Sequence, residues 1–325
     1  MRGTVVGVLR GGPSSEHDVS LATGHAILTN LPEDRYTARD IYIDRQGIWH
    51  ERGIPTTPER VLPSLDVAML GLHGEYGEDG GVQRLLERYG VPYTGSDSFA
   101  SSLAMHKVLT KEKAREHGLL TPKYYYVEDN TDPELAAREI TRNFHQPVIV
   151  KPVALGSSVG VSIVGGYAPV YQAIMALREN AGGVLVEELI KGTEATAGVV
   201  EHLRGEALYA LPPVEIVPPP HATFFDRTVK YDGTTTEIVP GRCSKFISEE
   251  LMRRGRLMHE ALGLRHYSRS DFIVSPRGIY FLETNTLPGM TGESLLPKSL
   301  ASVGVKFGDF LSHLVELALG RTHDR

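Results

Sequence analysis

Short apolar runs separated by glycine-containing polar segments dominate the first third of the chain. Three runs have the length and composition of buried strands: TVVGVL (4–9), ARDIYI (38–43) and DVAMLGL (66–72). Helical patterns lie between and after them. One starts after a cap at Ser14 or Ser15 and runs to about Thr29, and GGVQRLLERYG ends a second at Gly90. This alternation predicts a small parallel sheet with covered faces.

The pattern changes near Gly95–Asp97, where we place a domain boundary. A helical stretch follows through His117, and short strands and helices continue to GVLVEELI (183–190). From Glu194 onward the chain is richer in strand-like segments, such as EATAGVVE and GEALYALPPVEIV. The fold class expected from these patterns is therefore α/β.

One long segment, Pro218–Arg242, is largely polar and fits neither the helical nor the strand repeat of apolar residues. It opens with three consecutive prolines and contains DGTTTE. An irregular segment of this length inside a compact enzyme is often an active-site lid. The alternative is a disordered loop without a role.

Two strand-like runs in RSDFIVSPRGIYFLETNTLPGMTGES (269–294) carry polar residues at their ends. The segment Pro276-Arg277-Gly278 suits a three-residue hairpin loop. Counting outward from that loop predicts three cross-strand pairs: Ser275 with Ile279, Asp271 with Glu283, and Arg269 with Asn285. Side chains alternate between the faces of a strand, so the last two pairs share one face.

Two acids and an amide on one face are hard oxygen ligands, which suit Mg²⁺ or Mn²⁺ together with phosphate oxygens. The backbone N–H groups of residues 287–291, immediately after the acids, could stabilise an oxyanion. A solvated hairpin face with an Arg–acid pair is the alternative, and the hairpin alone leaves both open.

The segment VIVKPVALGSSVGVSIV (148–164) has the features of a phosphate-binding loop. A strand ends at Lys151, and the turn Gly156–Gly160 brings two glycines and two hydroxyls. Glycines let backbone N–H groups approach an anion, and the lysine adds positive charge. An ordinary hairpin loop with a surface lysine is the alternative. The chain has no G-x-G-x-x-G and no Gly-Lys pair, so neither a Rossmann fingerprint nor a P-loop is present.

Other charged residues allow both a functional and an ordinary interpretation. Glu187 and Glu194 flank an apolar run, where they suit an adenine amino group and ribose hydroxyls, or are simply exposed acids. Lys107 and Lys111 have the i, i+4 spacing of a basic surface face. Glu16 could bind a substrate ammonium, or be an acid favoured by the helix dipole. The loop HGEYGEDGG (73–81) matches no standard zinc pattern, and we expect it to approach a ligand.

Composition narrows the class of protein. The 325 residues are 41% hydrophobic and 23% charged, as in ordinary globular proteins, and suffice for two or three domains. A formal net charge of −6 argues against a general nucleic-acid binder. The single cysteine, Cys243, cannot form an intrachain disulfide, and residues 4–9 are too short to span a membrane. We therefore expect a soluble, cytoplasmic protein. A serine hydrolase lacks support, because no G-x-S-x-G occurs.

Seven segments taken in order resemble the D-alanine–D-alanine ligases of the ATP-grasp superfamily, over nearly the whole chain. They are GGPSSEHDVSLATG, LHGEYGEDGGVQRLLERYGVPYTGS, AMHKVLTK, VKPVALGSSVGVS, VEELIKGTE, KYDG and LETNTLPGMTGESLLP. Each is weak alone, but seven collinear segments are specific. The resemblance implies an α/β, three-domain ATP-grasp architecture: an N-terminal domain (1–96), a central subdomain (97–187) and a C-terminal subdomain (188–325) with a lid at about 218–242.

The resemblance also implies an activity. ATP would convert a first D-alanine into an acyl phosphate, a second D-alanine would attack it, and ADP and phosphate would leave, supplying peptidoglycan synthesis. The implied nucleotide-binding residues are Lys107, Lys151, Ser158, Glu187, Glu194, Phe224 and Lys230. Asp271, Glu283 and Asn285 would bind two Mg²⁺ or Mn²⁺ ions. Glu16, Ser157, Tyr231, Arg269, Gly289 and Ser294 would act on the two D-alanines.

The chain departs from the family pattern in a few places, and other functions stay open. His106 stands where we expect aspartate, Arg227 where we expect tyrosine, and Ser270 where an apolar residue is usual. None of them is a proposed ligand. The family also implies a homodimer without membrane or nucleic-acid partners. The alternatives are another ATP-grasp carboxylate–amine ligase, a D-alanine–D-lactate ligase and a non-catalytic nucleotide-binding module.

Overall fold

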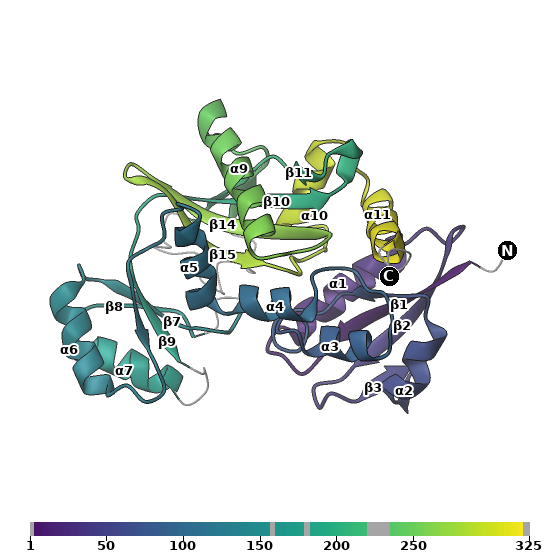
Figure 1. Ribbon diagram of the computed structural model, residues 1–325, viewed down its shortest axis with the longest axis horizontal. Coiled ribbons are helices and arrows are strands. Elements are labelled where there is room, and N and C mark those ends of the chain that lie inside the picture. Colours follow the sequence, from purple (N-terminus) through teal and green to yellow (C-terminus); the bar gives the residue numbers. More distant parts are fainter. Residues whose placement is uncertain (1–2, 157–159, 179–182, 220–234, 321–325) are drawn as a thin grey trace.

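The computed structural model describes residues 3–156, 160–178, 183–219 and 235–320. These residues form three sheets with helices around them (Figure 1). The first sheet lies at one end of the molecule with the chain's N-terminal helices, and the second lies at the other end with α6 and α7. The third sheet lies between them. The predicted α/β class is therefore confirmed.

The first sheet has the order β4-β3-β2-β1-β5. Its strands are β1 (Thr4–Gly11), β2 (Tyr36–Ile43), β3 (Trp49–Glu51), β4 (Ile54–Thr56) and β5 (Val67–Leu70), and its helices are α1 (His17–Asn30), the short α2 (Pro58–Val61) and α3 (Gly81–Arg88). The 3-10 turn η1 (Leu62–Ser64) follows α2. β1 pairs in parallel with β2 and β5, as predicted. β3 and β4 extend the sheet in antiparallel fashion and were not predicted.

The start of α1 differs from the prediction that Ser14 or Ser15 caps it. Glu16 occupies the cap position, and no side-chain hydrogen bond caps the helix. The hydroxyl of Ser14 accepts a hydrogen bond from the Glu16 N–H (3.1 Å) and donates one to the His73 carbonyl (2.8 Å). Ser14 therefore joins the β1–α1 turn to the loop after β5 instead of extending the helix.

The second sheet is antiparallel, with the order β6-β9-β7-β8. Its strands are β6 (Tyr124–Val127), β7 (Val148–Pro152), β8 (Ser162–Val164) and β9 (Val184–Glu188), and α6 (Pro133–Asn143) and α7 (Tyr167–Arg178) pack on it. Asp132 caps α6 by accepting from the N–H groups of Glu134 and Leu135, and proline starts the helix. Valines from β7 and β9 pack with Ile140 and Ile174 in a core of their own.

The third sheet is antiparallel along β13-β12-β10-β14-β15, and β11 also pairs with β10. Its strands are β10 (Thr193–Glu201), β11 (Leu208–Ala210), β12 (Val214–Val217), β13 (Thr236–Ile238), β14 (Tyr267–Ser275) and β15 (Gly278–Asn285). Helix α9 (Lys245–Ala261) covers it, and α10 (Leu295–Ser302) and α11 (Phe307–Gly320) follow. The 3-10 turn η2 (Leu203–Gly205) lies between β10 and β11.

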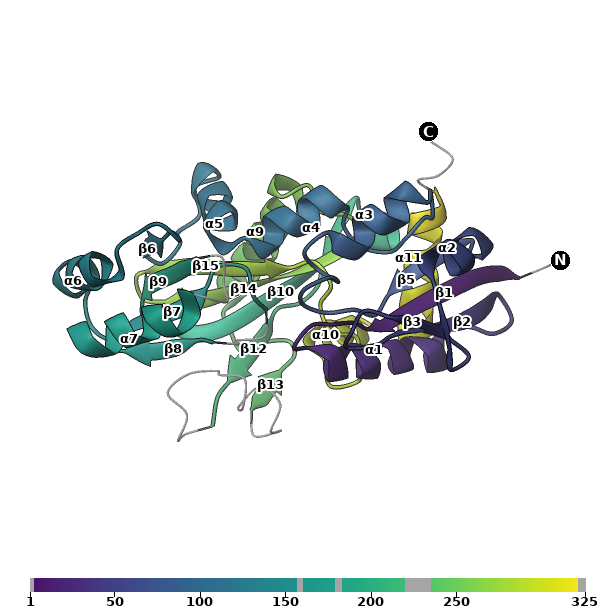
Figure 2. The same cartoon turned by 90° about the horizontal axis from the view of Figure 1, so that it is seen from below.

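Helices α4 (Ser98–Met105) and α5 (Lys107–Glu116) pack against the third sheet, on the same side as α9 (Figure 2). Ala100, Ala104 and Ala114 are buried there with Phe281 of β15. Small side chains allow this close helix–sheet approach. The predicted central unit, 97–187, therefore begins with two helices whose core belongs to the third sheet. The domain boundaries themselves stay a prediction.

The β14–β15 hairpin corrects the predicted turn. Ser275 pairs with Gly278 instead of Ile279, so the loop has two residues, Pro276 and Arg277. Gly278 has φ of +132°, a conformation that L side chains rarely adopt. A β-bulge then inserts one extra residue, and from that point Asp271 pairs with Glu283 and Arg269 with Asn285, as predicted. The shorter turn and the bulge shift the register in opposite directions, so these residues still share one face of the hairpin.

Part of the predicted irregular segment 218–242 is regular. Thr236–Ile238 forms β13, which pairs with β12. The adjacent Arg242 donates hydrogen bonds from its guanidinium and its backbone N–H to the Glu215 carboxylate of β12, at 2.7 and 2.8 Å. Residues 220–234 lie outside the described residues. The C-terminal end of the predicted lid therefore belongs to the ordered edge of the third sheet.

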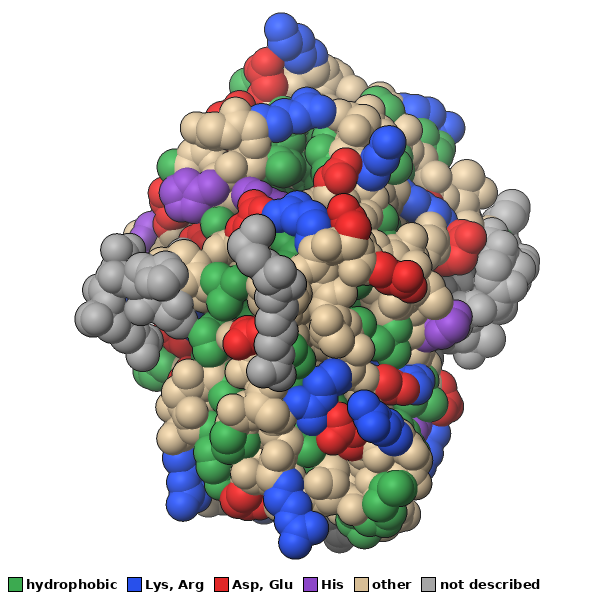
Figure 3. Space-filling view, turned by 90° about the vertical axis from the view of Figure 1, so that its right-hand side faces the viewer, with side chains coloured by type: hydrophobic (Ala, Val, Ile, Leu, Met, Phe, Trp, Pro, Cys, Tyr) green, Lys and Arg blue, Asp and Glu red, His purple; other side chains and the backbone are tan. Residues whose placement is uncertain are grey.

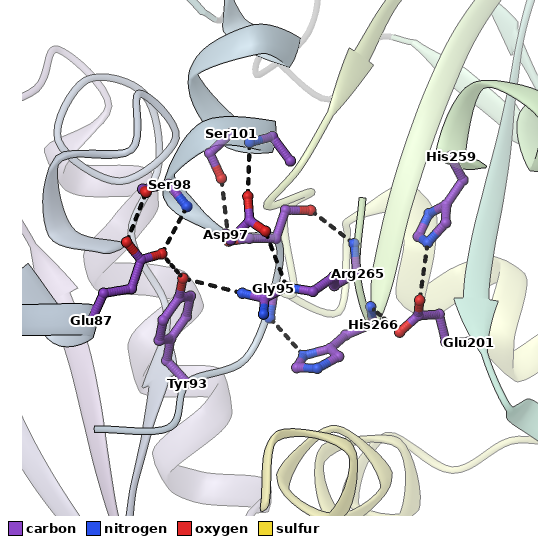
Figure 4. A network of polar contacts seen from close by, with 12 residues as sticks. Glu87, Tyr93, Gly95, Asp97, Ser98, Ser101, Glu201, His259, Arg265 and His266 are labelled. Carbon is purple, nitrogen blue, oxygen red and sulfur yellow. Dashed lines mark hydrogen bonds and ion pairs between the residues drawn. The ribbon is translucent and has the colours of Figure 1, made fainter. Parts of the chain in front are cut away.

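A polar network joins the first and third sheets (Figure 4). The Gly95 N–H donates to Nδ1 of His266 (3.0 Å), and the Arg265 N–H donates to the Ser96 hydroxyl (3.2 Å). The His266 N–H in turn donates to Glu201 on β10 (2.7 Å). The junction near the predicted boundary at Gly95–Asp97 is therefore held by directional bonds. A shared apolar core around β1, β5 and α11 adds to them.

On the face shown in Figure 3, basic and acidic side chains are interspersed over the surface. Among the described residues, every helix is too short or too polar to cross a membrane.

Candidate active site

A cavity of about 400 Å³ lies where the second and third sheets meet. Its lining includes residues of β7 and β9 from one sheet and of β10, β12, β14 and β15 from the other. Seven of the predicted site residues line it: Lys107, Lys151, Glu187, Glu194, Arg269, Asp271 and Glu283. Residues spread over more than 170 positions of sequence therefore meet in one cavity, which is the strongest structural support for the predicted site.

The cavity carries a dense cluster of charges. The Glu187 carboxylate contacts the ammonium groups of Lys151 (2.7 Å) and Lys111 (2.6 Å). Burial alone would raise the pKa of Glu187, but the two lysines lower it to about 2, so it is ionised. Burial opposes the charge of Lys151 as well, and its carboxylate neighbours Glu187 and Glu283 raise its pKa. The cluster therefore stays charged at neutral pH.

Lys107 lies at the first turn of α5, with its ammonium 2.6 Å from the Leu155 carbonyl and 3.7 Å from the Glu283 carboxylate. Burial is the main influence on it and lowers its pKa. Lys107 and Lys151 thus reach the same cavity from a helix and a strand, as expected for two phosphate-binding lysines.

Lys111 is a site residue that the sequence did not indicate. Its i, i+4 spacing with Lys107 suggested a basic surface face, but its side chain is fully buried. Burial lowers its pKa to about 8, against the opposing effect of Glu187. The only sequence signal was that Thr110, Lys111 and Ala114 fall on the face of α5 that would pack inward.

The predicted metal ligands lie together on β14 and β15. Asp271 and Glu283 are cross-strand partners, and the Asn285 amide nitrogen lies 3.0 Å from Asp271 Oδ2. Arg269 holds both oxygens of Asp271 in a bidentate pair at 2.9 Å. The alternative of an Arg–acid pair is thus partly true, but this pair is buried in the cavity wall, not solvated.

Glu16 lies in a pocket formed by two glycines. A Cβ on Gly74 would lie 2.8 Å from Glu16 Oε2, and one on Gly156 would lie 2.6 Å from the same atom. Only glycine leaves room for the carboxylate at Gly156, the residue that also lines the cavity. Glu16 itself is 9% exposed. The structure thus brings the side-chain carboxylate of Glu16 to the edge of the glycine-rich loop.

The loop after β5 holds the segment that follows the metal ligands. His73 Nδ1 lies 3.0 Å from the Leu287 carbonyl, and the Glu78 carboxylate accepts hydrogen bonds from the N–H groups of Leu287 (3.2 Å) and Gly74 (2.9 Å). Burial, and then the charge of Glu16, raise the pKa of Glu78 to about 7. The side chains of the loop 73–81 thus fix Leu287, two residues before Gly289. That this loop approaches a ligand stays a prediction.

Gly289 and Ser294 are also neighbours. A Cβ on Gly289 would lie 2.7 Å from the Ser294 hydroxyl oxygen, which accepts a hydrogen bond from the Thr291 N–H (3.1 Å). Neither Gly289 nor Ser294 is among the residues lining the cavity, although Leu295 is. Five other predicted residues lie outside the described residues: Ser157, Ser158, Phe224, Lys230 and Tyr231.

Two family models together match most of the chain. The D-ala D-ala ligase N-terminus matches residues 5–61 and 50–96, and the D-ala D-ala ligase C-terminus matches residues 114–316. The chain belongs to the D-alanine–D-alanine ligase family. The resemblance stated from the sequence is therefore confirmed.

Individual relatives agree with this membership. A protein named D-alanine–D-alanine ligase from Syntrophobacter fumaroxidans is 38% identical over 315 residues, 97% of each chain. The fold is similar to that of the VanG D-Ala:D-Ser ligase from Enterococcus faecalis, with a TM-score of 0.86 at 28% identity, covering 98% of this chain and 100% of that one. It is also similar to the D-alanine–D-alanine ligase from Bacillus anthracis complexed with ATP, with a TM-score of 0.80 at 30% identity and 99% coverage of each.

In this member of the family, the site has two described parts. The first is the charged cavity between the second and third sheets. The second comprises Glu16, which lies against Gly74 and Gly156, and the Gly289–Ser294 pair, which follows Leu287, the residue held by His73 and Glu78. Gly156 links them, because it lines the cavity and faces Glu16. Sequence patterns indicated seven residues that line the first part, but not its other charged lining residues, Glu188, Glu215 and Arg242, nor the role of Lys111 behind it. They indicated no positioning role for His73 or Glu78.

Proposed function

We propose that this chain is an ADP-forming ligase that joins two molecules of D-alanine into D-alanyl-D-alanine for peptidoglycan precursor synthesis. The observation that carries the proposal is the meeting of Lys107, Lys151, Asp271 and Glu283 in one cavity of a chain that belongs to this family over nearly its whole length. Lysines facing acids across a cavity are the groups that phosphoryl transfer from ATP requires.

ATP binds in the charged cavity under this proposal. Lys107 and Lys151 supply positive charge for the phosphates, and Glu194 supplies a carboxylate for the ribose hydroxyls. Apolar side chains in the lining suit a flat base: Ile149, Leu189, Ile190, Ile216 and Ile273. A hydrogen bond from adenine to Glu187 is expected from the family resemblance, although both oxygens of Glu187 already contact lysines. Ser158, Phe224 and Lys230 are proposed from the resemblance alone.

The residues present also suit the two divalent ions that the family resemblance implies. Asp271, Glu283 and Asn285 offer hard oxygen donors from adjacent strands, and the Asn285 amide nitrogen points its hydrogen at Asp271, so its carbonyl oxygen remains available as a ligand. The Glu283 side chain is 37% exposed, which leaves its carboxylate accessible to an ion. Mg²⁺ or Mn²⁺ held there would neutralise phosphate charge during the transfer.

The chain's own residues then account for the two chemical steps. A carboxylate oxygen of the first D-alanine attacks the γ-phosphorus of ATP, and ADP leaves while Lys107 and Lys151 stabilise the charge. The amine of the second D-alanine attacks the carbonyl carbon of the acyl phosphate and loses a proton. A C–N bond forms, and phosphate departs as the C–O bond breaks.

The second part of the site positions the amino acids. Glu16 pairs with the ammonium of the first D-alanine, in the room that Gly74 and Gly156 leave. The Gly289 N–H and the guanidinium of Arg269 stabilise the oxyanion. Nε and Nη2 of Arg269 hold Asp271, and Nη1 is the remaining nitrogen of the fork. Ser294 receives the carboxylate of the second D-alanine. Roles for Ser157 and Tyr231 rest on the resemblance alone.

A second candidate acceptor is D-serine. The observation that favours it is the similarity to the VanG D-Ala:D-Ser ligase, whose TM-score of 0.86 compares with 0.85 for the D-alanine–D-alanine ligase from Coxiella burnetii. Identity points the other way, because relatives named D-alanine–D-alanine ligase reach 39% whereas VanG is 28% identical. We therefore propose D-alanine as the main acceptor.

The test is product analysis with competing acceptors. The purified chain is incubated with ATP, Mg²⁺ and D-alanine, alone and with equal D-serine, D-lactate or L-alanine, and ADP and products are measured by mass spectrometry. D-Alanyl-D-alanine must dominate in every mixture. A dominant D-alanyl-D-serine or D-alanyl-D-lactate product would overturn the proposed acceptor, and no ADP release with any D-amino acid would overturn the proposed reaction.

The family resemblance further supports a homodimer. It also supports a location in the cytoplasm, where nucleotide and amino-acid precursors are available. Light scattering of the purified chain tests the dimer directly. A mass close to one chain of 35.6 kDa would overturn it.

A further inference from the structure

Lys111 occupies an unusual position for a lysine. It lies on α5 with its side chain fully buried, and its ammonium contacts groups on two different sheets. Glu187 Oε1 of β9 lies 2.6 Å away, and the Leu282 carbonyl of β15 accepts a hydrogen bond at 3.2 Å. A buried lysine requires such partners, because an uncompensated charge away from water is strongly unfavourable.

The Leu282 contact falls at the β-bulge of the hairpin. Phe272 pairs with Phe281 and Asp271 pairs with Glu283, so Leu282 is the extra residue between the two pairs. A bulge re-aims the side chains next to it, and loss of one residue of register turns a side chain to the opposite face. The orientation of Glu283 toward the cavity therefore depends on keeping Leu282 out of the ladder.

Glu187, the other partner of Lys111, also contacts a lysine of the cavity. The same carboxylate binds Lys151 at 2.7 Å, so Lys111 and Lys151 hold Glu187 from two sides. Lys111 is not among the residues that line the cavity, whereas Lys151, Glu187 and Glu283 are. Lys111 thus lies behind the cavity wall. It contacts Glu187, which pairs with Lys151, and Leu282, which precedes Glu283.

We propose that Lys111 is a positioning residue for the nucleotide and metal end of the site: its ammonium fixes the Leu282 bulge, and with it Glu283, and holds Glu187 against Lys151. The inference rests on the proposed function, because it assumes that Glu283 binds a metal ion near a nucleotide. Groups that orient metal ligands from behind typically contribute about 10- to 100-fold to metal affinity.

The experiment measures how strongly Mn²⁺ improves ADP binding, by calorimetric titration with and without the metal. The variant is Lys111→Met, which keeps an unbranched side chain, one atom shorter, and removes the charge. The expected result is a loss of about tenfold or more in the Mn²⁺-dependent improvement, with a smaller change in metal-free ADP affinity. Hydrogen exchange in the 278–285 peptide should also become faster, because the bulge loses its hydrogen bond.

Lys113→Met is the matched control. Lys113 lies on the same helix, but its side chain is 40% exposed and pairs with Glu116 at 2.8 Å, so its loss should change neither measurement. Lys111→Arg, which retains a cation, should recover much of the improvement. If Lys111→Met does not fold, Lys111→Gln carries the same test, because its shorter neutral side chain also loses the ion pair.

The outcomes separate the two proposals. If the unaltered chain shows no Mn²⁺-dependent ADP binding, the proposed metal and nucleotide function fails. If the unaltered chain shows it, and a folded Lys111→Met or Lys111→Gln protein retains it with unchanged exchange in 278–285, the role of Lys111 alone is overturned. A lower melting temperature without either change would mean that Lys111 only stabilises the core.

Discussion

Glu16 and Gly156 fit against each other so closely that a Cβ on Gly156 would lie 2.6 Å from Glu16 Oε2. We predict that Gly156→Ala displaces this carboxylate and raises KM for the first D-alanine by roughly tenfold, the scale of a weakened charged hydrogen bond. ADP affinity should change little. The measurement is initial rate against D-alanine at saturating ATP, with a separate ADP titration.

Gly165→Ala provides the control for that substitution. A Cβ on Gly165 would meet its nearest atoms at 3.8 Å, an ordinary contact. Its KM values should match those of the unaltered chain. An unchanged KM in Gly156→Ala as well would remove Glu16 from the first D-alanine subsite.

Ser294 is predicted to act on the second D-alanine and not on the first. Its hydroxyl is already placed by the N–H and the hydroxyl of Thr291, at 3.1 and 2.9 Å. Ser294→Ala should therefore raise KM for the second D-alanine by about 5- to 30-fold, from a loss of ~1–2 kcal/mol, and leave KM for ATP unchanged. Ser302→Ala, at the exposed end of the same helix, is the control. Equal changes in both D-alanine constants would contradict the assignment.

Glu78 predicts a pH dependence of stability with a definite sign. Burial, and then the charge of Glu16, raise the pKa of Glu78 to about 7, above the ordinary carboxyl value expected for the unfolded chain. A raised native pKa stabilises the fold fully below the ordinary pKa, and this contribution is lost as pH rises through about 7. The melting temperature of the unaltered chain should therefore fall, relative to Glu78→Gln, between about pH 5 and pH 8.

The comparison needs an acid without this environment. Glu75→Gln changes an exposed acid in the same loop, so its difference from the unaltered chain should stay flat over that range. A Glu78→Gln difference that is also flat would show that Glu78 titrates normally in the folded protein.

The hairpin illustrates how far the sequence could lead. Counting outward from a three-residue loop predicts Asp271 opposite Glu283, and this pair forms because the shorter turn and the bulge at Leu282 cancel. The two-residue turn and the bulge at Leu282 were not predictable, because a bulge is stabilised by a contact from elsewhere, here the ammonium of Lys111. Side-chain alternation predicted which residues share a face of the hairpin, and tertiary contacts determined the register of strand pairing.

Buried charges were the main failure of the sequence analysis. Lys111 follows the same spacing as a surface lysine, and its burial depends on Glu187, which lies 76 positions later in the chain. Likewise, the positions of His73 and Glu78 depend on Leu287, a partner that only the fold supplies. Family resemblance indicated residues that we expect to touch ligands, but the residues behind them became visible only through their contacts.

Glu283 gives the most direct test of the metal assignment. It pairs with Asp271 across the strands and lies 3.7 Å from Lys107, and backbone pairing, not its charge, places it in the sheet. Glu283→Gln keeps the shape and removes the charge, so the fold and metal-free ADP binding should persist. Ligation should fall by more than the ~10- to 100-fold typical of losing an outer support. Thermal unfolding, ADP titration and ligation across Mg²⁺ concentrations are measured beside Glu249→Gln, an exposed acid on α9. Near-normal ligation with an unchanged Mg²⁺ dependence would show that the β14–β15 face does not bind the catalytic metal.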